Sequence, residues 1–90
     1  MATVKFTYAL KRFYPDLCPM ELSGNTVKEI VGQLDVTYPG ISDYLVDERG
    51  RLRQHVNIFI GNNLINDRKS LQDSVKDGDE IYIMQALSGG

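Results

Sequence analysis

The sequence predicts a single α+β domain, in which one main helix packs on one face of a mixed sheet of four to five strands. Two observations support this fold class. Apolar and polar residues alternate with a period of two over residues 3–10, 55–60 and 80–85, which is typical of half-buried strands. Residues 27–38 instead carry apolar side chains at helical spacing. A chain of 90 residues suffices for one hydrophobic core, so we expect one domain.

The first strand is predicted over Thr3–Leu10, followed by a loop that contains Pro15 and Pro19. A short second strand is expected at Met20–Leu22, where a Ser-Gly-Asn turn ends it. The side chains that alternate on one side of the first strand are Val4, Phe6, Tyr8 and Leu10.

The main helix begins with a capping-box pattern, in which Thr26 is followed three residues later by Glu29. Its apolar stripe consists of Val27, Ile30, Val31, Leu34 and Tyr38. Pro39-Gly40 is expected to end the helix, and residues 41–45 fit one further helical turn.

The second half of the chain begins with the clearest strand, His55–Ile60. A turn then leads to the short apolar pair Leu64-Ile65. Residues 70–75 are predicted to form one helical turn capped by Ser70, and Asp77-Gly78 marks a tight turn. The last strand, over residues 80–85, is expected to bury Ile81 and Ile83 and to expose Tyr82 and Met84.

The element order is therefore hairpin, helix, strand, short strand, turn and strand. A helix with one apolar stripe must lie across a sheet face. The hairpin followed by a helical crossover is expected to make the next strand parallel to its partner. This order predicts the β-grasp arrangement, as in ubiquitin.

The composition argues against several function classes. A formal net charge of −2 and a pI near 5.2 give no support for a nucleic-acid partner. The lone Cys18 excludes an internal disulfide framework and a multi-cysteine metal site, and we expect an inert thiol. No apolar run approaches the ~18 residues that a membrane helix needs, and the first residues lack a secretory signal. We expect a cytoplasmic protein that is a monomer when free and binds no membrane.

No constellation of catalytic residues is visible. The chain has one histidine, His55, one cysteine, and neither a glycine-rich phosphate loop nor a motif that pairs carboxylates. We therefore expect a protein that other enzymes act on, and not an enzyme.

Two glycines, Gly89 and Gly90, follow the last strand at a short distance. Because they lack side chains, they could pass through a narrow channel and present a carboxylate to another protein's active site. We expect residues 1–86 to form the domain and residues 87–90 to form a flexible tail.

In this context three segments resemble the MoaD/ThiS family of ubiquitin-like sulfur carrier proteins. They are Val56–Asn62, Leu71–Val75 with Asp77–Asp79, and Leu87–Gly90. Residues 38–41 and 52–58 look like the family members that supply sulfur for amino-acid biosynthesis. The tail lacks the Arg-Leu-Arg-Gly-Gly pattern of ubiquitin, which counts against a general protein-tagging role.

The resemblance implies that the Gly90 carboxylate is adenylated and then converted to a thiocarboxylate, which donates sulfur in cysteine or homocysteine/methionine biosynthesis. The chain itself would bind no cofactor, because ATP and magnesium are used by the activating enzyme. The implied partners are a ubiquitin-activating-like adenylating enzyme, a sulfur donor or sulfurtransferase, an acceptor sulfhydrylase or synthase and, where proteolysis exposes the glycines, a metallopeptidase. The alternatives are sulfur donation in molybdopterin or thiamine synthesis, a modifier that forms isopeptide bonds to lysines, and a non-covalent interaction module.

The resemblance also assigns site residues. Gly90 would carry the sulfur, and the residues that enter the partner's active site with it would be Leu87, Ser88 and Gly89. Strand parity places a docking surface beside the tail on the uncovered sheet face, formed by Phe59, Tyr82, Met84 and Ala86. A further set of cationic residues is expected to form a solvated loop face, with steering of an acidic partner as the alternative: Arg49, Arg51, Arg53 and His55.

Overall fold

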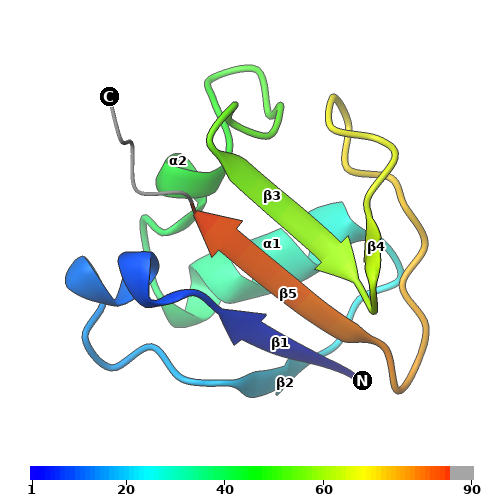
Figure 1. The fold of residues 1–90 in the computed structure, drawn as a ribbon, viewed down its shortest axis with the longest axis horizontal. Coiled ribbons are helices and arrows are strands. Elements are labelled where there is room, and N and C mark those ends of the chain that lie inside the picture. Colours follow the sequence, from blue (N-terminus) through cyan, green and yellow to red (C-terminus); the bar gives the residue numbers. More distant parts are fainter. Residues whose placement is uncertain (86–90) are drawn as a thin grey trace.

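The computed structural model describes residues 1–85, and it shows the predicted β-grasp architecture. A five-stranded sheet has the strand order β2-β1-β5-β3-β4, and the main helix α1 lies across one of its faces (Figure 1). The strands are β1 (Ala2–Phe6), β2 (Met20–Leu22), β3 (Val56–Ile60), β4 (Asn63–Leu64) and β5 (Glu80–Gln85). The helices are the 3-10 helix η1 (Tyr8–Arg12), α1 (Val27–Thr37) and α2 (Ser42–Leu45).

The strand pairing follows from the connections. β1 pairs antiparallel with β2 through the hairpin, and it pairs parallel with β5. The prediction that the strand after the helix is parallel to its partner is wrong, because β3 pairs antiparallel with both β4 and β5. The helix connects β2 to β3, and β1 and β5 lie between these two strands in the sheet. β5 also pairs antiparallel with β3, with Ile58 opposite Ile83 and Val56 opposite Gln85. β5 therefore lies at the centre of the sheet, where its inward side chains Ile81 and Ile83 are almost completely buried.

The first strand is shorter than predicted, because it ends at Phe6 and not at Leu10. The Thr7 amide still donates to the Ile83 carbonyl at 3.1 Å, but the Leu10 amide turns back to the Thr7 carbonyl at 3.3 Å and starts η1. Leu10 is nevertheless fully buried. The burial of Leu10 agrees with its predicted place on the apolar side. The alternation over residues 7–10 does not distinguish a strand from a 3-10 turn.

Helix α1 begins as the capping box predicts. The Thr26 hydroxyl oxygen accepts from the Glu29 amide at 3.2 Å, and the Glu29 carboxylate accepts from the Asn25 amide at 2.8 Å, one residue before the cap. Four residues of the predicted stripe face the sheet and are buried: Val27, Ile30, Val31 and Leu34.

The helix ends before Pro39, and Gly40 allows the turn into α2 with a φ of +94°. The Asp35 carboxylate then accepts from the amides of Ser42 at 3.0 Å and Gly40 at 3.1 Å. These bonds lower the pKa of Asp35, the Ser42 amide contributing most. They also connect α1 to the predicted extra turn, which buries Leu45.

Residues 70–75 do not form the predicted helical turn, and Ser70 is not a cap. The Asp67 carboxylate instead accepts from the amides of Lys69, Ser70 and Gln72. The segment is irregular, with a φ of +55° at Leu71, and two of its carbonyl groups accept hydrogen bonds from α1. The Leu71 carbonyl accepts from the Lys28 amide at 2.8 Å, and the Asp73 carbonyl accepts from the Val27 amide at 3.1 Å.

Those two amides belong to the first turn of α1 and have no acceptor inside the helix. Leu71 and Val75 are buried as predicted, although the conformation that buries them is different.

Among residues 1–85 no helix is both long enough and apolar enough to span a membrane.

Candidate functional site

The first part of the candidate site is the end of β5, at the last described residue. Gln85, the last residue of β5, lies opposite Val56 at the start of β3 (Figure 1). Its amide donates to the Thr7 hydroxyl at 3.1 Å, which fixes the end of β5 next to β1 as well. Within residues 1–85 the buried side-chain oxygen of Gln85 has no hydrogen-bond donor, so one acceptor remains beside residue 86.

The predicted tail lies outside the described residues. This holds for the proposed sulfur-bearing Gly90, for Leu87, Ser88 and Gly89, and for Ala86 of the docking surface. The expected boundary between a domain over residues 1–86 and a tail over residues 87–90 therefore stays a prediction.

The second part is an apolar surface on the sheet face that α1 does not cover. The strand register brings Phe59 opposite Tyr82 and Asn57 opposite Met84. Tyr82 is 37% exposed and Met84 is 38% exposed, whereas Phe59 is half-buried. Three of the four predicted docking residues are therefore neighbours on one face.

Leu64 belongs to the same surface, although the sequence pattern did not predict it there. Leu64 lies opposite Phe59 and is 52% exposed. Its place depends on the tight turn through Gly61, which has a φ of +62° and lets the two-residue strand β4 fold back onto β3. We call Phe59, Leu64, Tyr82 and Met84 the outer-face patch.

A charged pair borders this patch. The Lys5 ammonium donates to the Glu80 carboxylate at 2.7 Å, and Lys5 lies beside Tyr82 in the register of β1 and β5. The bond raises the pKa of Lys5 and lowers the pKa of Glu80. Both side chains are largely exposed, so the pair contributes little to folding and marks a polar rim.

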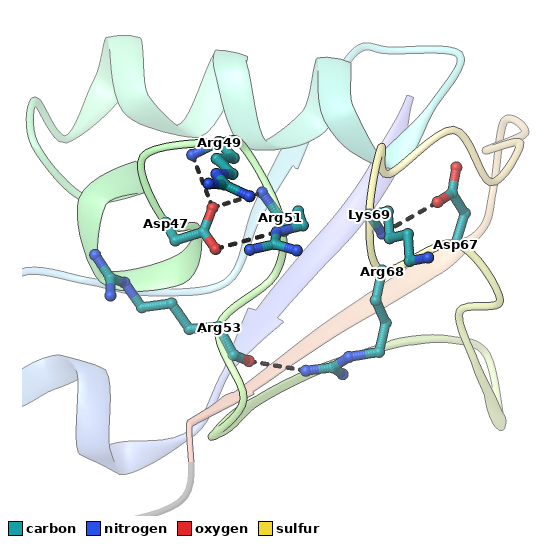
Figure 2. A network of polar contacts seen from close by, with 7 residues as sticks. All are labelled: Asp47, Arg49, Arg51, Arg53, Asp67, Arg68 and Lys69. Carbon is teal, nitrogen blue, oxygen red and sulfur yellow. Dashed lines mark hydrogen bonds and ion pairs between the residues drawn. The ribbon is translucent and has the colours of Figure 1, made fainter.

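The third part is a set of cationic loops. Three of the four predicted cationic residues, Arg51, Arg53 and His55, line one groove together with Arg68 and Lys69. Arg49 does not line this groove. Figure 2 shows Arg51, Arg53, Arg68 and Lys69, of which Arg68 and Lys69 were not predicted. These two residues follow β4 in sequence and come close to residues 51–55 only through the fold. No sequence signal for this juxtaposition was available, because no element was predicted for residues 66–69.

The described residues offer no metal site of conventional composition. In the range 1–85 no three histidine, cysteine, aspartate or glutamate side chains are grouped to hold a metal ion. Cys18 is a free, exposed thiol in the loop before β2, and His55 is exposed in the loop before β3. The site consists of the end of β5, an apolar face and a cationic border, a combination typical of surfaces that bind proteins.

Comparison with known proteins agrees with this arrangement. The family model described as ThiS family matches residues 14–90. The sulfur carrier protein CysO of Mycobacterium tuberculosis is 33% identical over 70 residues, which cover 76% of this chain and 75% of the relative.

Two solved structures extend the similarity over almost the whole chain. The Amycolatopsis orientalis BexX/CysO complex contains a chain with a TM-score of 0.85 and 28% identity, and the match covers 100% of both chains. The small archaeal modifier protein 1 of Methanosarcina acetivorans has a TM-score of 0.77 and 29% identity, covering 99% of this chain and 95% of that one. The family model, the curated relative and the fold together show that this chain belongs to the ThiS family.

Proposed function

We propose that this chain is a sulfur carrier protein for cysteine biosynthesis, in which the carboxylate of Gly90 is converted to a thiocarboxylate. The similarity to the CysO sulfur carrier carries this proposal. The family match extends to Gly90, five residues after the point where Gln85 is fixed at the end of β5. The chain would be a protein co-substrate in the cytoplasm, and homocysteine or methionine synthesis is the neighbouring destination of the same chemistry.

The chemistry has two steps. In the first, a carboxylate oxygen of Gly90 attacks the α-phosphorus of ATP and releases pyrophosphate, which leaves an acyl adenylate. In the second, a sulfide nucleophile attacks the acyl carbon, AMP leaves, and loss of a proton gives the thiocarboxylate. The adenylating enzyme supplies ATP and magnesium, and a sulfur donor supplies the sulfide. Where a sulfurtransferase persulfide is the donor, a thiol must attack its S–S bond to release the sulfide, leaving a disulfide. This chain supplies the carboxylate and the surface that delivers it.

The tail residues and the outer-face patch have different tasks in this proposal. Leu87, Ser88 and Gly89 would follow Gly90 into the partner's active site, and Gly89 would avoid collisions because it has no Cβ. The outer-face patch, extended by Ala86, would dock the adenylating enzyme and later the acceptor sulfhydrylase. An exposed apolar patch with a polar rim is the usual character of such a surface.

A second candidate function is a ubiquitin-like modifier that forms isopeptide bonds to lysines. The 29% identity to small archaeal modifier protein 1 favours it. The carrier function has the better support, because the curated relative and the structure with the higher TM-score are both CysO. Both functions begin with adenylation of Gly90, and the product of the second step distinguishes them.

Adenylation is tested by exchange of labelled pyrophosphate into ATP, catalysed by the adenylating enzyme in the presence of this chain. We expect exchange with the full chain, none when Gly90 is deleted, and a strong reduction with Gly89→Ala. Gly32→Ala is the matched control, since Gly32 lies on the exposed side of α1 and an added Cβ meets no atom within 4 Å. Full exchange by the chain without Gly90 would overturn the proposal.

A further inference from the structure

A cationic groove lies beside the end of β5, although the chain as a whole carries a net charge of −2. It has a volume of about 630 Å³. Its lining residues are Asp47, Arg51, Leu52, Arg53, Gln54, His55, Arg68 and Lys69. Four of these side chains are formally positive and one is a carboxylate. We call this site the basic groove, and Figure 2 shows five of its lining residues: Asp47, Arg51, Arg53, Arg68 and Lys69.

Two aspartates shape the loops on either side of the basic groove. The Asp47 carboxylate accepts from the amides of Arg51 at 3.0 Å and Arg49 at 2.9 Å, and it lies 3.4 Å from the Arg51 guanidinium. These contacts lower the pKa of Asp47, with the Arg51 amide as the largest cause. The Asp67 carboxylate holds the facing loop in the same way, and the Ser70 amide is the main reason for its lowered pKa.

Arg68 joins the two loops (Figure 2). Its guanidinium donates to the Arg53 carbonyl at 2.8 Å and to the side-chain oxygen of Asn57 at 3.1 Å. The Arg53 guanidinium in turn donates to the Asp43 carbonyl at 2.9 Å. All three acceptors are neutral, and in the part of the chain that the structure describes neither arginine forms an ion pair. The two guanidinium groups are thus held in place without their charge being neutralised.

The basic groove adjoins both the end of β5 and the outer-face patch. His55 directly precedes Val56, which lies opposite Gln85. Asn57, which accepts from Arg68, lies opposite Met84 of the patch. The five residues after Gln85 can span at most about 18 Å. A protein that holds Gly90 in its active site must therefore cover the region around Gln85, next to this groove.

We propose that the basic groove docks an acidic surface of the adenylating enzyme, an inference that rests on the proposed function. Adenylation brings an anionic carboxylate towards an anionic nucleotide. Positive charge near the end of β5 favours an encounter in which this end faces the enzyme. The other faces of the chain, whose net charge is negative, are disfavoured.

Carboxylate side chains fit the basic groove better than a nucleotide phosphate does. Phosphate sites are commonly built from backbone amides at turns or helix N-termini. Here the turn amides already donate to Asp47 and Asp67. What remains is a row of guanidinium and ammonium groups, which suits carboxylates spread along a protein surface.

The test is the kinetics of adenylation with the full chain as substrate, at low and at high salt. We compare Arg53→Glu/Lys69→Glu with the control Lys28→Glu/Lys76→Glu, which makes the same change of net charge at exposed sites outside the groove. We expect the groove variant to raise the KM for the carrier about tenfold at low salt, with kcat within about twofold and a smaller effect at high salt. The control should stay near wild type.

The single variant Lys69→Glu tests whether misfolding explains the effect of the double variant. Within residues 1–85 the Lys69 side chain forms no hydrogen bond that the substitution would remove. It should change the KM in the same direction by a smaller factor, with an unchanged melting temperature. Equal KM values for groove and control variants would overturn the docking inference and leave the proposed function standing. A raised KM for ATP instead would assign the basic groove to the nucleotide and also overturn it. Failure of the wild-type chain itself to be adenylated would refute the proposed function.

Discussion

Two neighbouring residues of β5, Ile83 and Tyr82, allow the two faces of the sheet to be tested separately. Ile83 is completely buried against α1, and Tyr82 is 37% exposed on the opposite face. Truncating a fully buried isoleucine to alanine costs about 2–5 kcal/mol, from lost transfer free energy and the cavity that remains. A domain of this length has a total free energy of unfolding of about 5–13 kcal/mol. Ile83→Ala should therefore remove a large fraction of the stability.

With a loss of about 3 kcal/mol, the melting temperature should fall by about 12–24 °C. The matched variant Tyr82→Thr keeps a residue that favours strands, and it loses mainly the cross-strand contact with Phe59. We expect that loss to be about 1 kcal/mol. Urea unfolding followed by circular dichroism measures both values.

The two variants should rank in the opposite order when their effects on adenylation kinetics are compared with their effects on stability. Ile83→Ala, assayed at a temperature where it is folded, should retain the KM of the wild type. Tyr82→Thr should raise the KM for the carrier by about tenfold or more, as expected for an aromatic residue at the centre of an interface. The face assignment is refuted if Tyr82→Thr destabilises the fold as much as Ile83→Ala. An unchanged KM for Tyr82→Thr would refute docking through the outer-face patch.

Three further predictions concern local structure. Thr26→Ala should destabilise the domain by about 1 kcal/mol in urea unfolding, because α1 loses its capping oxygen; a change near zero would contradict the cap. Gly40→Ala should cost about 1–2 kcal/mol in the same assay, since its φ is +94° and the new Cβ would lie 3.2 Å from the Tyr14 hydroxyl; wild-type stability would contradict that backbone conformation. The pKa of Asp35 is lower in the folded state, so its contribution to stability is present above the unfolded pKa and is lost as the pH falls through the folded pKa. Asp35→Asn should therefore flatten the acid side of the stability–pH curve relative to wild type, and an unchanged slope would exclude this group as a source of it.

Most of the fold could be predicted from the sequence because the signals are local. The capping box at Thr26 and the alternation in β3 and β5 each specify an element, and the apolar stripe of α1 then requires a sheet face to cover it. The irregular conformation of residues 70–75 could not be predicted in this way. It is set by hydrogen bonds to the first turn of α1, which lies more than forty positions earlier in the chain.

In the candidate site, too, the residues marked by a local sequence pattern could be predicted and the others could not. Strand parity was enough to place Phe59, Tyr82 and Met84 on one face. Arg68 was missed, because its position next to Arg53 depends on the path of the loop after β4 and on acceptors from two other elements. A cluster made by folding, with no regular spacing in the sequence, becomes visible only in three dimensions.

The proposed carrier function depends most directly on the chemical state of Gly90 after activation. Its measurement is intact and tandem mass spectrometry of the full chain, incubated with the adenylating enzyme, ATP, magnesium and a sulfide source. We predict the replacement of one oxygen by one sulfur, located at Gly90 and absent from the chain without Gly90. An unchanged mass with an enzyme that activates its own carrier, or conjugation to lysines without any sulfur product, would contradict the proposed carrier function.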